Sequence, residues 1–174
     1  MTVTALIIEV PEAEPVVGEL RRSFDPTAIQ GVPAHVTVLV PFIDGAAIQT
    51  SDLDRLRSLF AEERAFHYAF GKVGRFPDAT YLAPEDASPF VELTQAVVAA
   101  FPEYLPYGGV FSEVIPHLTV AHGLNPGLDE AAELLQAWST ANEPVCGRCR
   151  EVLLLEQRSN SWQVIQRFQL ASDA

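Results

Sequence analysis

The stretch PAHVTVLVPF (residues 33–42) contains a histidine two positions before a threonine, within a run of β-branched residues. Such a run is typical of a β-strand, in which successive side chains point to opposite faces. His35 and Thr37 therefore share one face, and Val36 and Val38 share the other. The pattern predicts a strand that buries its valines and presents an imidazole and a hydroxyl on the opposite side.

The same pattern returns in the second half of the chain, as PHLTV (residues 116–120). His117 and Thr119 again share one face, and Leu118 points to the other. The two histidines are 82 positions apart in a chain of 174 residues, and each motif follows a helical pattern and a proline-containing loop. We therefore expect a pseudo-twofold duplication within a single domain over residues 1–174.

Hydrophobic periodicity predicts strands and helices that alternate along the chain, and so an α+β fold. The expected strands are 3–10, 35–40, 66–73, 80–83, 117–121, 152–156 and 162–170. The expected helices are 12–24, 51–63, 88–101 and 128–140, and a hairpin turn is expected at 159–161.

The overall charge narrows the class of partner. The formal net charge is −12 and the pI is near 4.6, whereas affinity for long duplexes comes mainly from Lys and Arg. We therefore expect a small nucleotide or an RNA end, bound at a local pocket. No stretch approaches the ~20 apolar residues of a membrane helix. We expect a cytoplasmic protein that does not bind membranes; the oligomeric state is left open, with a monomer favoured.

Two cysteines, Cys146 and Cys149, form a lone C-G-R-C sequence. A zinc site would need a second pair of ligands, and a thioredoxin-type motif would be followed by a helix, whereas a strand is expected here. We interpret them as a reduced pair in or beside a strand, with redox chemistry as the open alternative.

A pair of imidazoles on one cleft suits phosphodiester cleavage. The attacking nucleophile must lose a proton and the leaving alkoxide must gain one, and two groups with pKa values near ~6.5 can supply both. Thr37 and Thr119 could hydrogen-bond the non-bridging oxygens. This scheme requires neither a metal nor a cofactor. It predicts a bell-shaped pH profile with its top between about pH 6 and 8.

The paired His-x-Thr motifs at this spacing, in a duplicated α+β pattern, resemble the 2H phosphoesterase superfamily, in its bacterial 2′-5′ RNA ligase-like or 2′,3′-cyclic phosphodiesterase branch. The resemblance implies a bilobal fold in which two antiparallel sheets line a central cleft and helices pack outside. It implies that His35 and His117 are the general acid and base, in an order that the motifs leave open, and that Thr37 and Thr119 bind phosphate. It also implies hydrolysis of a 2′,3′-cyclic phosphate, with 2′-5′ RNA joining as an alternative.

Other residues have more ordinary interpretations. His67 is expected on the solvent side of its strand, and His122 lies an odd number of positions from His117, which argues against a shared metal site. Lys72 and Arg75 are weaker candidates for cleft charge. The candidates for stacking on a base are Phe42, Phe76, Tyr81 and Tyr107.

Two alternatives without catalysis stay open. The motif histidines could be half-buried structural residues, and the threonines could simply be good strand formers. The chain could also be a phosphate- or nucleotide-binding module without turnover.

Overall fold

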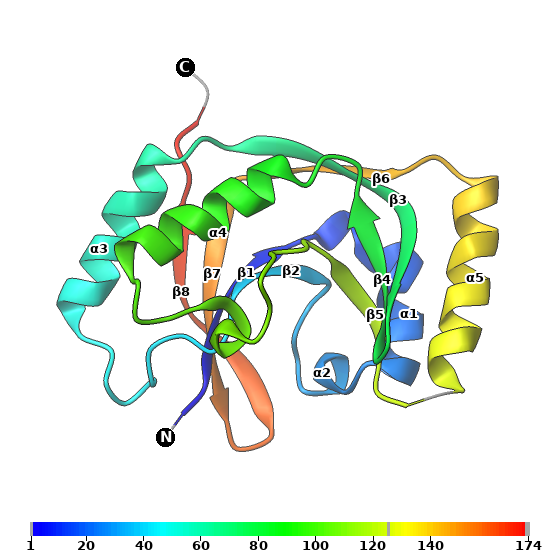
Figure 1. The fold of residues 1–174 in the computed structure, drawn as a ribbon, viewed down its shortest axis with the longest axis horizontal. Coiled ribbons are helices and arrows are strands. Elements are labelled where there is room, and N and C mark those ends of the chain that lie inside the picture. The colour runs from blue at the N-terminus through cyan, green and yellow to red at the C-terminus, as the bar shows by residue number, and fades with distance from the viewer. Residues whose placement is uncertain (1, 125, 173–174) are drawn as a thin grey trace.

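The structure, a computed structural model, describes residues 2–124 and 126–172. All the helices and strands expected from the sequence are present, together with one further strand and three short helices (Figure 1). The strands are β1 (Thr4–Glu9), β2 (His35–Leu39), β3 (Phe66–Phe76), β4 (Ala79–Pro84), β5 (Leu118–His122), β6 (Val145–Cys149), β7 (Glu151–Arg158) and β8 (Ser161–Gln169). The helices are η1 (Pro11–Ala13), α1 (Glu14–Phe24), α2 (Pro26–Ile29), α3 (Thr50–Glu62), α4 (Ser88–Ala100), η2 (Pro106–Gly109) and α5 (Gly127–Ala141).

The eight strands form an antiparallel sheet in the order β6-β3-β4-β5-β2-β1-β7-β8. Its two halves have matching layouts: β2 is followed outward by β1, β7 and β8, and β5 is followed outward by β4, β3 and β6. The halves meet where β2 pairs with β5, and the register there consists of one pair among the described residues, Val36 with Leu118. The two sheets expected from the family resemblance are therefore joined at a narrow junction. The α+β, bilobal, pseudo-twofold class is confirmed.

Two helices each connect strands of one half of the sheet but pack on a strand of the other half. Helix α1 joins β1 to β2 but packs on β5, and α4 joins β4 to β5 but packs on β2. Helix α5 covers β3, β4 and β5, and α3 packs against β8 and α4. Figure 1 shows α3 with α4 at one end of the molecule and α1 with α5 at the other. These helix contacts therefore join the two halves in addition to the narrow strand junction.

The main hydrophobic core takes one face of each motif strand. Val36 and Val38 are 1% and 3% exposed, and Leu118 and Val120 are fully buried. The residues between them on β2 and β5 are only partly buried. This alternation confirms the expected orientation of both motifs, because burying the apolar residues leaves the histidines and threonines on the opposite face.

The cysteines lie in β6, an edge strand that pairs with β3. Both are free; Cys146 is exposed and Cys149 is buried. Burial raises the pKa of Cys149 to about 12, so its thiol is a poor nucleophile at neutral pH. The interpretation as a pair in a strand is confirmed.

Candidate functional site

The register between β2 and β5 brings the two motifs together. Because Val36 lies opposite Leu118 in an antiparallel pair, continuing that register sets His35 across from Thr119 and Thr37 across from His117. Directly opposed residues point to the same face, and Val36 and Leu118 point into the core. All four motif side chains therefore occupy the other face of the sheet.

The two histidines are diagonal neighbours in this arrangement. Diagonal neighbours in a regular antiparallel ladder lie about 7–8 Å apart, so two imidazole rings in these positions can reach a single phosphate. The rings also interact electrostatically, because a charge on His117 lowers the pKa of His35. The sequence alone could place each pair of side chains on a face, but the shared face depends on this tertiary pairing.

Both imidazoles are oriented by a backbone carbonyl two residues earlier. His35 Nδ1 lies 2.8 Å from the carbonyl oxygen of Pro33, and His117 Nδ1 lies 2.7 Å from that of Ile115. A carbonyl oxygen only accepts hydrogen bonds, so Nδ1 of each ring carries a proton. In the neutral ring Nε2 then has a free lone pair, which is the form that a general base requires.

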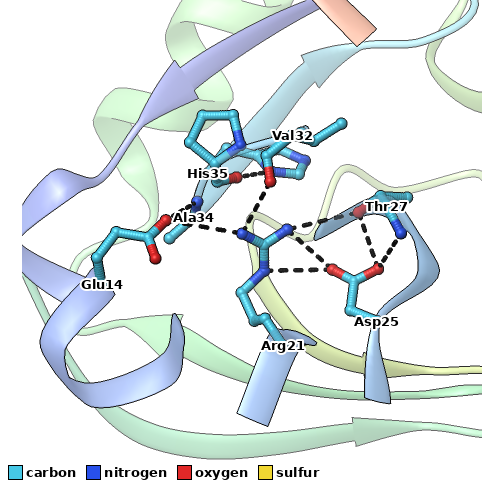
Figure 2. Close-up of polar contacts among 8 residues, drawn as sticks. Glu14, Arg21, Asp25, Thr27, Val32, Ala34 and His35 are labelled. Atoms are coloured by element: carbon cyan, nitrogen blue, oxygen red, sulfur yellow. Dashed lines mark hydrogen bonds and ion pairs between the residues drawn. The ribbon is translucent and has the colours of Figure 1, made fainter. Parts of the chain in front are cut away.

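A buried arginine lies behind His35 (Figure 2). Arg21 of α1 is 2% exposed, and its Nε and one terminal nitrogen donate to Asp25 Oδ2 at 3.2 and 2.9 Å. The same terminal nitrogen lies 3.4 Å from the hydroxyl of Thr27. Asp25 is itself 2% exposed and accepts a hydrogen bond from the backbone N–H of Thr27 at 3.0 Å. These contacts compensate the burial of both charges.

This network holds the segment that leads into the first motif. The other terminal nitrogen of Arg21 donates to the carbonyl of Val32 at 3.1 Å, and the backbone N–H of Ala34 donates to Glu14 Oε1 at 2.6 Å. The carbonyl of Pro33, between them, accepts from the ring of His35. Three consecutive residues before the histidine are thus each held by a hydrogen bond, as Figure 2 shows. We call Glu14, Arg21 and Asp25 the clamp.

The environment of His35 disfavours the charged form of its ring. Burial and then the nearby charge of Arg21 are the main causes that lower the pKa of His35 to about 4. The hydrogen bond to Pro33 and the charge of Asp25 oppose the shift but do not cancel it. His35 is therefore neutral at neutral pH in the free protein.

His117 has different surroundings. Its ring packs edge-on against Phe76, with centroids 5.0 Å apart, and lies 5.3 Å from the ring of Tyr81. Burial lowers its pKa as well, whereas the hydrogen bond to Ile115 and the charge of Asp78 raise it. Phe76 and Tyr81, which the sequence suggested as base-stacking residues, thus contact the second histidine directly.

The remaining aromatic candidates separate into one core residue and one at the site. Phe42 is 5% exposed and packs against Phe101 and Tyr104, so it belongs to the core. Tyr107 lies in η2; burial raises the pKa of its phenol, and the nearby side chain of Thr37 lowers it. Its backbone N–H donates to the carbonyl of Val40 at 2.6 Å. Tyr107 thus extends the site beyond the four motif residues.

The two basic candidates lie on opposite faces. Arg75 pairs with Asp129 of α5 at 2.6 Å, on the helix-covered side, so it does not contribute charge to the face that carries the motifs. Gly74 of β3 lies opposite Tyr81, which lies opposite Thr119, so Gly74 shares the motif face. Lys72, two positions before Gly74, is on that face and exposed.

The other histidines do not join the site. His67 is exposed, as expected, and His122 Nε2 lies 3.6 Å from Asp78. Over residues 2–124 and 126–172, no group of three or more His, Cys, Asp or Glu side chains is placed to hold a metal ion.

A separate hollow of about 730 Å³ lies near the sheet edge. It is lined by residues of η1, β3, β6 and the β4–α4 loop, including Glu12, His67 and Arg148, and by none of the four motif side chains. Acidic and basic groups alternate around it without selecting one ligand charge. The candidate site is therefore defined by the convergence of the motifs and not by the size of a pocket.

Comparison with known proteins gives a family and a fold. The family model described as the 2′-5′ RNA ligase superfamily matches residues 9–161. TT0787 of Thermus thermophilus has a similar crystal structure, with a TM-score of 0.62 and 17% identity over 100% of both chains. E. coli LigT in apo form is similar with a TM-score of 0.62 and 14% identity over 98% of each chain. No curated protein sequence matches this chain.

LigT has also been crystallised in complex with 3′-AMP, and that structure gives a TM-score of 0.59 and 13% identity over 97% of this chain and 98% of LigT. At these identities the likeness establishes the fold. It agrees with the α+β arrangement described above.

Proposed function

This chain belongs to the 2′-5′ RNA ligase superfamily, and from that premise we propose that it is a metal-independent phosphodiesterase that hydrolyses a 2′,3′-cyclic phosphate of a nucleotide or RNA end. The observation that carries the proposal is the convergence of His35, Thr37, His117 and Thr119 on one face of the sheet. Each imidazole there has its Nδ1 fixed by a carbonyl and its Nε2 free for proton transfer.

The different surroundings of the histidines support a division of roles. His35 is neutral because it is buried beside Arg21, so its Nε2 takes the proton of the attacking water. A new bond then forms between the water oxygen and phosphorus. The bond from phosphorus to one ribose oxygen breaks, and His117, in its charged form, donates a proton to that oxygen. The negative substrate and Asp78 both favour the charged form of His117.

The threonines stabilise the phosphate in this scheme. The hydroxyl of Thr37 donates its proton to a non-bridging oxygen, and Thr119 does the same from β5. Such donors act on the charge that builds up as water attacks.

The likeness to LigT supports a nucleotide-sized partner. LigT has been crystallised with 3′-AMP and with NADP+, each of which carries a phosphorylated ribose. A net charge of −12 favours such a partner over long nucleic acid. RNA joining is the second candidate, because the family is described by that activity, and the same charge weighs against it.

The predicted location is the cytoplasm. Among the described helices none is long and apolar enough to span a membrane.

The test is a turnover panel in the presence of EDTA with the four nucleoside 2′,3′-cyclic monophosphates. We expect the wild-type protein to open at least one of them, and His35→Ala and His117→Ala each to lower kcat/KM by about 10²–10⁴-fold. His67→Ala is the matched control, because His67 is exposed and lies outside the motifs. Chromatography of the product identifies the monophosphate isomer.

Three outcomes would count against the proposal. Turnover that appears only with added divalent metal would overturn the two-histidine scheme. Nucleotide binding without turnover would identify a binding module. Joining of RNA ends without hydrolysis of the cyclic monophosphates would favour the ligase.

A further inference from the structure

A single peptide group connects the ring of His35 to the carboxylate of Glu14 (Figure 2). Its carbonyl, that of Pro33, accepts a hydrogen bond from Nδ1 of His35 at 2.8 Å. Its N–H, that of Ala34, donates to Glu14 Oε1 at 2.6 Å. The carbonyl and the N–H of a trans peptide group lie in one plane and point in opposite directions, because the C–N bond between them has partial double-bond character. Holding the N–H therefore fixes the direction of the carbonyl, and with it the direction of the ring that donates to the carbonyl.

The hydrogen bond from Ala34 to Glu14 also carries charge toward the ring. A carboxylate that accepts from an amide N–H polarises the peptide group and makes its carbonyl a stronger acceptor, because hydrogen bonds in a chain reinforce one another. A histidine that gains a proton at Nε2 becomes a stronger donor at Nδ1. The carbonyl of Pro33 can therefore stabilise the charge that appears on His35 when it acts as a base.

The second motif has no equivalent connection. The carbonyl that accepts from Nδ1 of His117 is that of Ile115, and the next residue is Pro116, whose nitrogen carries no hydrogen. No acceptor can hold that peptide group by its nitrogen. The difference is visible in the sequence as P-A-H in the first motif and I-P-H in the second. Of the two motif rings, only His35 can be reached by a carboxylate through a peptide group.

Helix α1 leaves room for this carboxylate. Gly18, one turn after Glu14, is buried in the interior of the helix, where glycine is less favourable than alanine. A Cβ at that position would lie 2.8 Å from Glu14 Oε2, so the glycine lets the carboxylate lie close to the helix. The guanidinium of Arg21 lies 3.9 Å from Glu14 Oε1 and adds a favourable charge. The position of Glu14 is therefore supported from its own helix as well as by Ala34.

We propose that Glu14 is a positioning residue for the reaction, and that it holds His35 as the general base through the peptide group between Pro33 and Ala34. This inference rests on the proposed function and adds to it a carboxylate that acts on the base without touching the substrate. Carboxylates orient catalytic histidines directly in many hydrolases. Here one peptide group lies between the two side chains.

Two substitutions of Glu14 separate its hydrogen bond from its charge at the start of α1. Glu14→Gln keeps an oxygen that can accept from Ala34, whereas Glu14→Ala removes the acceptor, and both remove the charge. With a nucleoside 2′,3′-cyclic monophosphate that the protein opens, we expect Glu14→Ala to lower kcat by about 10–100-fold with little change in KM. Glu14→Gln should recover most of this loss.

The matched control is Glu19→Ala, because Glu19 is an exposed glutamate of the same helix. It should leave kcat unchanged. The side chain of Glu14 is 40% exposed, so both of its variants leave the buried pair of Arg21 and Asp25 in place. A wild-type kcat in Glu14→Ala, a loss confined to KM, or equal losses in the two Glu14 variants would each overturn the proposed role.

A spectroscopic measurement separates this inference from the proposed reaction. The NMR chemical shifts of the ring nitrogens report which nitrogen of a neutral histidine carries the proton, with or without turnover. We expect the proton of His35 on Nδ1 in the wild-type protein and in Glu14→Gln, and partly on Nε2 in Glu14→Ala. His117 is the internal control and should not change in either variant.

The outcome for His35 decides the role of Glu14 whether or not the protein is an enzyme. The expected change in a protein without turnover would support the positioning of the ring while the hydrolase proposal fails. A ring that carries its proton on Nε2 in the wild-type protein, or that stays fully protonated on Nδ1 in Glu14→Ala, would overturn the inference even in an active enzyme.

Discussion

The two histidine motifs are nearly identical in sequence and differ in what surrounds them. Both rings are oriented by a carbonyl two residues upstream. His35 is backed by a buried arginine, whereas His117 packs against Phe76 and Tyr81 and is influenced by Asp78. The comparison teaches that a duplicated motif can supply unlike groups, because the charge of Arg21 adds to the effect of burial on the pKa of His35, whereas the charge of Asp78 opposes that effect at His117.

The largest expected effect comes from removing the arginine that backs only one of the two histidines, and it is a loss of folding stability. Arg21→Met should lower the free energy of unfolding by about 3–5 kcal/mol, because it leaves the carboxylate of Asp25 buried without its partner. Urea unfolding at pH 7 measures the change. Arg22→Met is the control, because Arg22 is the next residue of α1 and is exposed. Similar losses in the two variants would show that the clamp does not stabilise the fold in the way described.

The next effect is the pH dependence of stability. His35 has a pKa of about 4 in the folded protein against an ordinary value of 6.5. Between these values the unfolded chain binds the proton and the folded protein does not, so stability falls as pH decreases from 6.5 to 4. The full contribution is on the order of 3 kcal/mol.

This contribution is measured by urea unfolding at pH 7, 5.5 and 4.5. His35→Gln should lose less stability than the wild-type protein over that range, since glutamine does not titrate, and His67→Gln serves as an exposed control. If His35→Gln loses as much as the wild-type protein, the low pKa of His35 is contradicted.

The smallest effect concerns the acidity of His117. The sequence predicts a bell-shaped profile with its top between about pH 6 and 8, but both histidine pKa values are lowered in the structure. For kcat/KM, which reports the free enzyme, we expect the acid limb near pH 4 and the alkaline limb below 6.5.

Asp78→Asn should move the alkaline limb to lower pH by about a few tenths of a unit, because it removes a charge that raises the pKa of His117. The shift should shrink in high salt, because Asp78 is exposed. His122→Gln, which removes the other neighbour of Asp78, should leave the limb in place. A shift of the acid limb instead would assign the general acid to His35.

The sequence predicted the long regular elements well and missed one strand and three short helices. Strand β6 reads VCGRC, in which glycine and arginine interrupt any apolar alternation. Its pairing with β3, from Phe66–Cys149 to Phe70–Val145, supplies hydrogen bonds that no local pattern reveals. Gly147 is also required there, because a Cβ at that position would overlap the side chains of Tyr68 and Glu12. Tertiary pairing thus overrides weak local propensity at this edge.

For residues around the site, too, the local sequence left open what the tertiary structure decides. The sequence could not distinguish Arg75 from Lys72, because a bulge after Phe70 and the ion pair with Asp129 decide which residue faces the helices. Arg21 and Glu14 look like ordinary charged positions of an amphipathic helix. Only the return of the chain at residues 32–34 turns them into the clamp of His35.

The sequence by itself determined which residues alternate on each motif strand, because a period of two separates the valines and leucine from the histidines and threonines. It also determined that two copies of the motif exist. The tertiary structure decided that the copies share one face, through the pairing of Val36 with Leu118, and that their histidines differ. The physical reason is that strand alternation is local, whereas strand pairing, burial and the charge beside a ring depend on segments far apart in the chain.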